Sequence, residues 1–183
     1  MPDNEFGFTP WGMDWVRLAE PLSVTKPEPL LPRARSIARH GGVRTEIEHT
    51  VVRATIHRGS EASVTYLEFA PLTGAAIRTI AELVPAGALT PTDEMHAAIR
   101  AAGITLAPTL TSADCSCRAR TTRCVHMLAT CYTLARMVDE NPWLALDLQG
   151  YRTGGATEEG PEPAPARWTP IDSLDPARFF DLA

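Results

Sequence analysis

The chain lacks the features that place a protein in or across a membrane. It has no apolar run of about 18 residues, the length that a membrane-spanning helix requires. Residues 1–14 contain acidic and aromatic side chains and no apolar core of the signal-peptide type. We therefore expect a cytoplasmic protein with no membrane partner. Disulfides rarely persist in a reducing compartment, so clustered cysteines in this four-cysteine chain are candidates for metal binding.

Sequence signatures of several enzyme classes are missing as well. There is no H-E-x-x-H helix, no Gly-Lys phosphate loop and no G-x-S-x-G turn. The histidines at positions 40, 49, 57 and 96 have no acid or nucleophile at motif spacing, and we expect them to be surface or sheet residues. The sequence thus predicts no catalytic activity and no small-molecule substrate.

Positive charge is scarce. Lysine occurs once, at Lys26, and 17 Lys and Arg residues face 22 Asp and Glu residues, for a net charge of −5. Nonspecific nucleic-acid binding requires several cations to neutralise phosphates, so this balance argues against it as the dominant activity. Charge is nevertheless segregated, since residues 33–58 and 115–136 are mostly basic and the chain after Asp139 is acidic. Either a basic face or an ordinary solvated surface of mixed charge would give this pattern.

What the chain does contain is a compact set of soft metal ligands. The pattern is C-x-C, six residues and C-x-H, and the set, called the Cys/His cluster below, comprises Cys115, Cys117, Cys124 and His126. Zinc prefers tetrahedral sets of thiolate sulfur and imidazole nitrogen, and four protein ligands make a closed, structural site. Chance proximity of buried cysteines is disfavoured, because the chain has only four Cys and five His. Cys131 is predicted to be a core residue.

The surroundings of the cluster favour bound metal. Three thiolates and one zinc ion carry one net negative charge, which Arg118, Arg120 and Arg123 would offset. The N-terminus of the helix predicted to follow would add its positive dipole end. Both influences favour the thiolate over the thiol.

This pattern resembles the SWIM zinc finger. That finger occurs in bacterial proteins associated with Swi/Snf-type ATPases, in plant transposase-like proteins and in recombination factors. The resemblance covers residues 6–151 and includes an aromatic segment (11–16), a helical Leu-Val-Pro pattern (83–85) and an acidic–Pro–aromatic turn (139–143). It implies zinc at the Cys/His cluster, binding to DNA or protein, and no catalysis. Two departures remove positive charge: Val125 stands where relatives usually have a basic residue, and Met13 and Asp14 stand where arginines often occur.

Hydrophobic periodicity predicts an α+β fold: a small antiparallel three-stranded sheet with a helical layer and a zinc-pinned buried helix. Alternation predicts strands over 43–48, 52–57 and 64–69, and a further short strand over 104–106. The helical period predicts helices over 11–18, 33–40, 77–84 and 91–102. Residues 124–139 are apolar on most sides, which favours a central core helix; a face that awaits a partner is the alternative.

The chain divides into three predicted parts. Residues 1–32 hold the aromatic helix and a Pro-rich linker, and 33–151 form the zinc-finger domain, with a meander at 43–69, helices at 75–102, and the finger and its helix at 109–148. Residues 152–183 are predicted to be a flexible acidic tail. Its apolar residues form a candidate docking segment: Trp168, Ile171, Leu174, Phe179 and Phe180. This segment would bind a partner protein or fold back on its own domain.

Two functions follow from these features. The first is a non-catalytic adaptor whose partner, by resemblance, is a Swi/Snf-type ATPase or another nucleoid protein; the acidic composition and the aromatic tail favour it. The second is direct DNA binding through arginines near the zinc: Arg118, Arg120, Arg123 and Arg136. DNA binding requires that these arginines gather on one face, where they can contact phosphates together.

Overall fold

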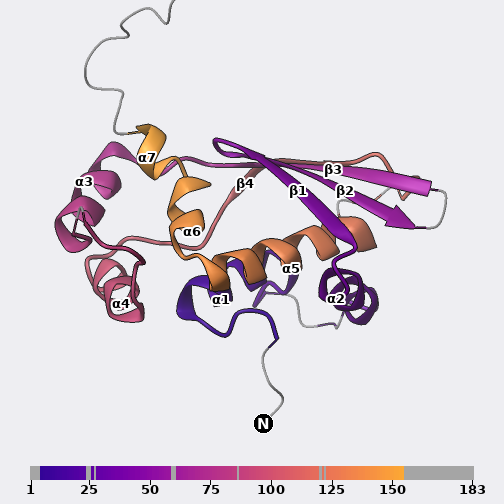
Figure 1. Ribbon diagram of the computed structural model, residues 1–183, viewed down its shortest axis with the longest axis horizontal. Helices are drawn as coiled ribbons and strands as arrows, with labels where there is room; N and C mark the ends of the chain where they lie inside the picture. The colour runs from indigo at the N-terminus through magenta and orange to yellow at the C-terminus, as the bar shows by residue number, and fades with distance from the viewer. Residues whose placement is uncertain are drawn as a thin grey trace, which may run out of the picture.

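A sheet with helices on one of its faces forms the body of the protein (Figure 1). The structure, a computed structural model, describes residues 5–23, 26, 28–58, 61–85, 87–119, 121 and 123–154. The strands are β1 (Val43–Glu48), β2 (Val51–Arg58), β3 (Glu61–Phe69) and β4 (Leu110–Cys115). The helices are α1 (Pro10–Ala19), α2 (Leu31–Arg39), α3 (Gly74–Leu83), α4 (Asp93–Ala101), α5 (Val125–Glu140), α6 (Trp143–Asp147) and α7 (Tyr151–Gly154). The candidate docking segment in the tail lies outside the described residues.

The predicted three-stranded sheet is wrong, because β4 pairs antiparallel with β3 and gives a four-stranded sheet in the order β1-β2-β3-β4. The pairing of β3 with β4 has a register shift at Glu68/Phe69, and this shift explains why the sequence pattern did not predict β4. Leu110 and Ala113 both pack against the core although they are three residues apart, so the period of two that marks a strand is lost. The strand predicted over 104–106 does not form. The α+β class itself is retained.

Helix α5 is the centre of the core, as predicted. It lies between the sheet on one side and α1 and α2 on the other (Figure 1). Most of its residues are buried, including Leu134, Ala135 and Cys131. A buried polar contact ties it to the sheet, since Thr130 Oγ1 lies 3.0 Å from Thr65 Oγ1. Within the described residues, no helix combines the length and apolarity needed to cross a bilayer.

A buried carboxylate near the end of α5 holds the N-terminal segment. Asp139 is 6% exposed and accepts hydrogen bonds from the Gly7 N–H (2.6 Å), the Thr9 N–H (2.9 Å) and the Thr9 hydroxyl (2.8 Å). Thr9 in turn caps α1. Gly12 is needed beside it, because a Cβ there would lie 2.1 Å from Asp139 Oδ1. The aromatic segment and the acidic–Pro–aromatic turn, remote in sequence, therefore pack together.

One histidine of α4 lies in a different environment from the one expected. His96, expected on the surface or in the sheet, is buried at 4% exposure. Its Nε2 lies 2.9 Å from Asp14 Oδ2, and its ring and that of Trp11 pack in a T-shaped arrangement with centroids 4.9 Å apart. The acid partner that the sequence did not reveal is thus supplied by α1, 82 residues away.

Glu20, the C-cap of α1, joins three helices. Its Oε1 accepts a hydrogen bond from Arg35 Nη2 of α2 (2.5 Å) and one from the Tyr132 hydroxyl of α5, and Arg35 Nε donates to that hydroxyl at 3.0 Å. Burial alone would raise the pKa of Glu20, but the hydrogen bonds from Tyr132 and Arg35 outweigh it and hold the pKa below 4.5. The ionised carboxyl therefore stabilises the packing of α1 and α2 on α5.

Glu20→Gln is expected to lower the free energy of unfolding at pH 7 by about 1 kcal/mol, a small value because the pair is partly exposed. A lowered carboxyl pKa contributes stability above its unfolded value, and this contribution is lost as pH falls through the folded pKa. The difference between wild type and variant should thus shrink below pH 4.5. Chemical denaturation from pH 7 to acid measures it, with Glu82→Gln on α3 as an exposed control. A pH-independent difference would contradict the assignment.

Candidate metal centre

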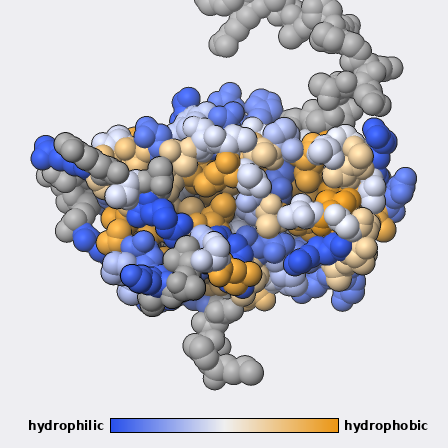
Figure 2. All heavy atoms as spheres, turned by 180° about the vertical axis from the view of Figure 1, so that it is seen from behind, coloured by the Kyte–Doolittle hydropathy of each residue, from blue (hydrophilic) through white to orange (hydrophobic). Residues whose placement is uncertain are grey.

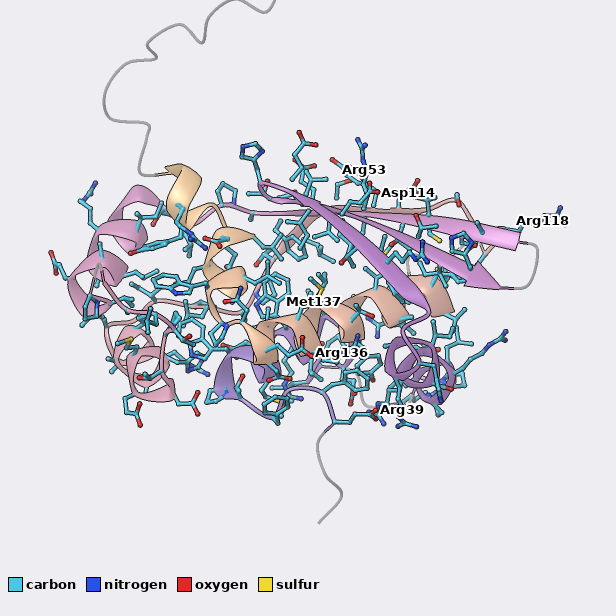
Figure 3. The ribbon with its side chains drawn as sticks, in the orientation of Figure 1. Arg39, Arg53, Asp114, Arg118, Arg136 and Met137 are labelled. Carbon is cyan, nitrogen blue, oxygen red and sulfur yellow. The ribbon has the colours of Figure 1, made fainter. Side chains whose placement is uncertain are left out.

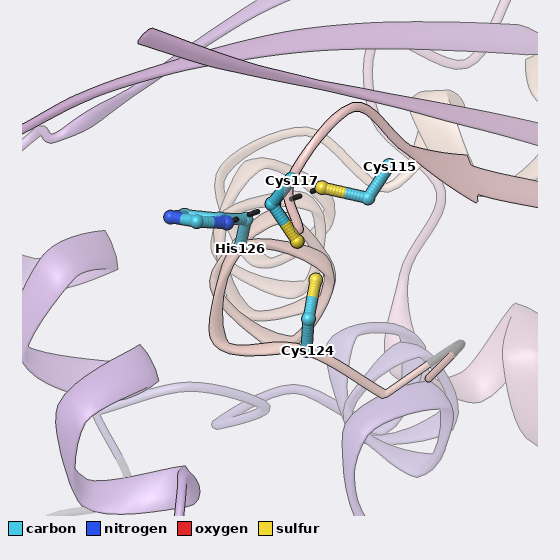
Figure 4. A group of neighbouring side chains, drawn as sticks. All are labelled: Cys115, Cys117, Cys124 and His126. Atoms are coloured by element: carbon cyan, nitrogen blue, oxygen red, sulfur yellow. Dashed lines mark hydrogen bonds between the residues drawn. The ribbon is translucent and has the colours of Figure 1, made fainter. Parts of the chain in front are cut away.

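The Cys/His cluster lies where β4 ends and α5 begins. Cys115 is the last residue of β4, and Cys117 follows it in the adjoining turn. Cys124 is the N-cap of α5, and its Sγ accepts a hydrogen bond from the Met127 N–H at 3.4 Å. His126 lies in the first turn of the helix. The four side chains point toward one another in Figure 4, because β4 is fixed by β3 and α5 by the core.

The geometry fits a single metal ion. The donor atoms of the four residues all lie within 4.8 Å of one another, and Cys115 Sγ is 4.0 Å from His126 Nδ1. In a tetrahedral zinc site with Zn–S near 2.3 Å, neighbouring donors are about 3.5–3.8 Å apart. Shifts of less than about 1 Å would therefore complete the site. The cluster could hold a metal ion, with Nδ1 as the ligand atom of His126.

The thiols differ in how readily they ionise without metal. Burial raises the pKa of the Cys115 thiol from 9.0 to about 12. Burial also opposes ionisation of Cys117, but the Ala119 N–H and the neighbouring thiols donate to its sulfur and lower its pKa. A metal ion would have to displace protons from the cluster, so its affinity falls as pH decreases. Cys131 stands apart as a buried core thiol, as predicted, with its pKa raised to about 12 by burial.

Arg123, one of the predicted DNA-binding residues, has a structural role. Its guanidinium donates to the carbonyl oxygens of Ala19 (2.6 Å) and Leu18 (3.4 Å). These carbonyls lie at the C-terminal end of α1, where unpaired backbone acceptors and the helix dipole attract a cation. The side chain therefore fastens the loop before α5 to α1.

Arg136 also contacts a helix end. It donates to the Ala38 carbonyl of α2 at 3.3 Å and lies 3.9 Å from Glu140. Figure 3 shows Arg136 on the side of α5 away from the sheet, and Arg118 beyond the end of the sheet near the Cys/His cluster. Arg120 lies outside the described residues. The three described arginines thus point to different parts of the surface, and nearness in sequence to the cluster could not reveal this.

Arg123→Ala is expected to reduce stability by about 1–2 kcal/mol, since two carbonyls lose their donor. In a chain of this size that corresponds to a fall of about 2–8 °C in melting temperature. Arg118→Ala, at an exposed position, should leave the melting temperature unchanged. Thermal unfolding and the salt dependence of DNA binding test both variants. An unchanged melting temperature with a flattened salt slope for Arg123→Ala would assign this residue to DNA instead.

No known protein family, curated protein or solved structure matches this chain. A function for this chain is therefore inferred from the Cys/His cluster and its surroundings.

Proposed function

We propose that this chain is a non-catalytic, zinc-binding interaction module of the SWIM type, which serves as an adaptor in a protein complex acting on DNA, for example with a Swi/Snf-type ATPase. The observation that carries the proposal is the convergence of four donor atoms within 4.8 Å. A tetrahedral ion there has all its positions filled by protein, which leaves none for water or substrate. The metal would hold a surface in shape and take no part in chemistry.

The chemistry of the donors favours zinc. Three sulfurs and one imidazole nitrogen suit zinc, whereas calcium and magnesium require oxygen ligands. The nearest acid in sequence, Asp114, is exposed and lies on the face of the sheet away from the helices (Figure 3). No carboxylate among the described residues belongs to the cluster.

Several observations favour a protein partner over DNA. Arg123 and Arg136 are engaged at helix ends, and the net charge is −5. The face in Figure 2 carries separate hydrophobic areas among hydrophilic ones, with no continuous apolar surface. Large apolar surfaces accompany permanent partners, whereas separate areas suit an adaptor that binds through limited contacts.

The test combines metal content with partner capture. Elemental analysis of the purified full chain should find one zinc per chain. The tagged chain, recovered from nuclease-treated native lysate, should retain a stoichiometric protein partner, and Cys124→Ser should lose it together with the metal. Cys131→Ala, which leaves the cluster intact, is the matched control. Partners that vanish with nuclease would favour direct DNA binding, and protein without metal would overturn the proposal.

A further inference from the structure

Two adjoining hollows flank the first turn of α5 and are called the cluster groove below. The larger, about 700 Å³, is lined by residues that include Leu30, Cys117 and Arg118. The smaller, about 250 Å³, is lined by residues that include Arg33 and Ile56. Val125 and His126 line both hollows. Cys124 also lines the larger hollow, so three of the four cluster residues border it and the groove adjoins the candidate metal centre.

The walls of the groove combine apolar and cationic side chains. Leu30, Ile37 and Val125, which are partly exposed, supply apolar surface, and Arg33 and Arg118 are exposed cations. Neither arginine has an ion-pair partner within the described part of the chain, in contrast to arginines such as Arg35 or Arg152. None of the described residues lining the groove is acidic. A matching ligand carries negative charge beside large apolar side chains.

This chain contains such a segment. Residues 155–183 have six acidic residues and two arginines, a net charge of −4 (2 − 6), and five large apolar residues lie between Trp168 and Phe180. We propose that the acidic, aromatic segment 168–182 binds in the cluster groove of its own chain. The inference rests on the proposed function in one respect, because bound metal would hold Cys117 and Cys124, which line the groove, in place.

The tether is long enough. The described chain ends at α7, at the opposite end of the sheet from the end of β2 and the start of β3 (Figure 1). His57 of β2 and Ala62 of β3 line the groove. The nine residues of β3 span about 30 Å of this separation. Residues 155–167 reach about 43–47 Å when extended. A tether of this length gives millimolar effective concentration, so a segment that binds with a dissociation constant of about 0.1 mM or less would keep the groove mostly filled.

Charge distinguishes the groove from the other hollow near α7. That hollow, about 450 Å³, lies between α3 and residues 103–109, and its described lining is uncharged. An acidic segment gains no electrostatic attraction there. DNA is less suited to the cluster groove, because two arginines neutralise few phosphates. A partner that uses the groove would have to compete with the segment already bound.

The experiment uses fluorine NMR of the full, zinc-loaded chain labelled with 5-fluorotryptophan, in which Trp168→Phe identifies the Trp168 signal. We expect this signal to be as broad as those of buried Trp11 and Trp15. In Arg33→Glu/Arg118→Glu it should become about threefold narrower or more, because a released side chain moves on the faster timescale of a loose terminus. The matched control, Ala75→Glu, adds an acid to the uncharged hollow and should leave the signal broad. Salt at about 0.5 M should narrow the wild-type signal without any substitution.

The outcomes separate this inference from the proposed function, because zinc content and melting temperature are measured on every sample. A narrow Trp168 signal in zinc-loaded wild type would overturn the inference and leave the metal module intact. If the Trp168 signal narrowed only in Ala75→Glu, the segment would bind in the uncharged hollow instead. If the width of the signal depended on protein concentration, the segment would bind a second copy of the chain. Either result would overturn the inference. Duplex DNA that binds through Arg33 and Arg118 without displacing Trp168 would do the same. Wild type without zinc would overturn the proposed function whatever the Trp168 signal shows.

Discussion

Cys124→Ser is expected to release the metal and to lower the melting temperature by about 10–20 °C. Cys124 is 3% exposed, caps α5 and belongs to the Cys/His cluster. Structural zinc contributes roughly 10–16 kcal/mol of apparent binding energy in small peptides, and whole domains are stable by only about 5–15 kcal/mol. Loss of about 5 kcal/mol is enough for this shift in a chain of this size.

Calorimetry with elemental analysis tests this expectation. Cys115→Ser and His126→Ala should behave like Cys124→Ser, and a strong chelator should lower the melting temperature of wild type but not of these three metal-free variants. Cys131→Ala separates metal loss from core damage, because Cys131 is buried outside the cluster. This control should have a somewhat lower melting temperature than wild type and keep one zinc per chain. If Cys124→Ser retained both its zinc and the wild-type melting temperature, the ligand assignment would be wrong.

Asp139→Ala is expected to destabilise the protein by about 3–5 kcal/mol. The carboxylate is buried and accepts from two backbone N–H groups and one hydroxyl. Buried donors that lose a charged acceptor account for the large value. Denaturant unfolding monitored by tryptophan fluorescence measures it, with exposed Glu140→Ala as the matched control.

A second substitution tests the geometry behind this value. Gly12→Ala should destabilise wild type because its Cβ would meet the Asp139 carboxylate. In Asp139→Ala the same substitution should cost much less, because the obstructing oxygens are gone. The two effects are therefore expected to be strongly non-additive. Additive effects would show that Gly12 and Asp139 act independently.

The sequence was sufficient where the signal is local. The ligands of the Cys/His cluster lie within twelve residues, so their spacing alone predicts the site. The helix over 124–139 follows from a nearly continuous apolar pattern, and β1 to β3 follow from simple alternation. In each case one segment of chain contains the whole pattern.

Long-range contacts were beyond the sequence. The register shift at Glu68/Phe69 removes the alternation that would reveal β4. The partners of Arg123 and of His96 lie 104 and 82 residues away in the chain, and no spacing rule connects them. An arginine near a metal motif is therefore equally compatible, in sequence, with a phosphate contact and with a helix cap.

The Asp139 contact has a consequence for the order in which the protein forms. The residues of the Cys/His cluster are close together in the sequence, so only a short loop has to close, whereas Gly7 and Asp139 are 132 positions apart. Loop-closure entropy rises with that separation, which disfavours early formation of the longer contact. During synthesis α1 leaves the ribosome early, but its carboxylate partner is made more than a hundred residues later. Helix α1, although it is synthesised well before α5, is thus expected to dock late, and its two tryptophans stay exposed to solvent until α5 has been made.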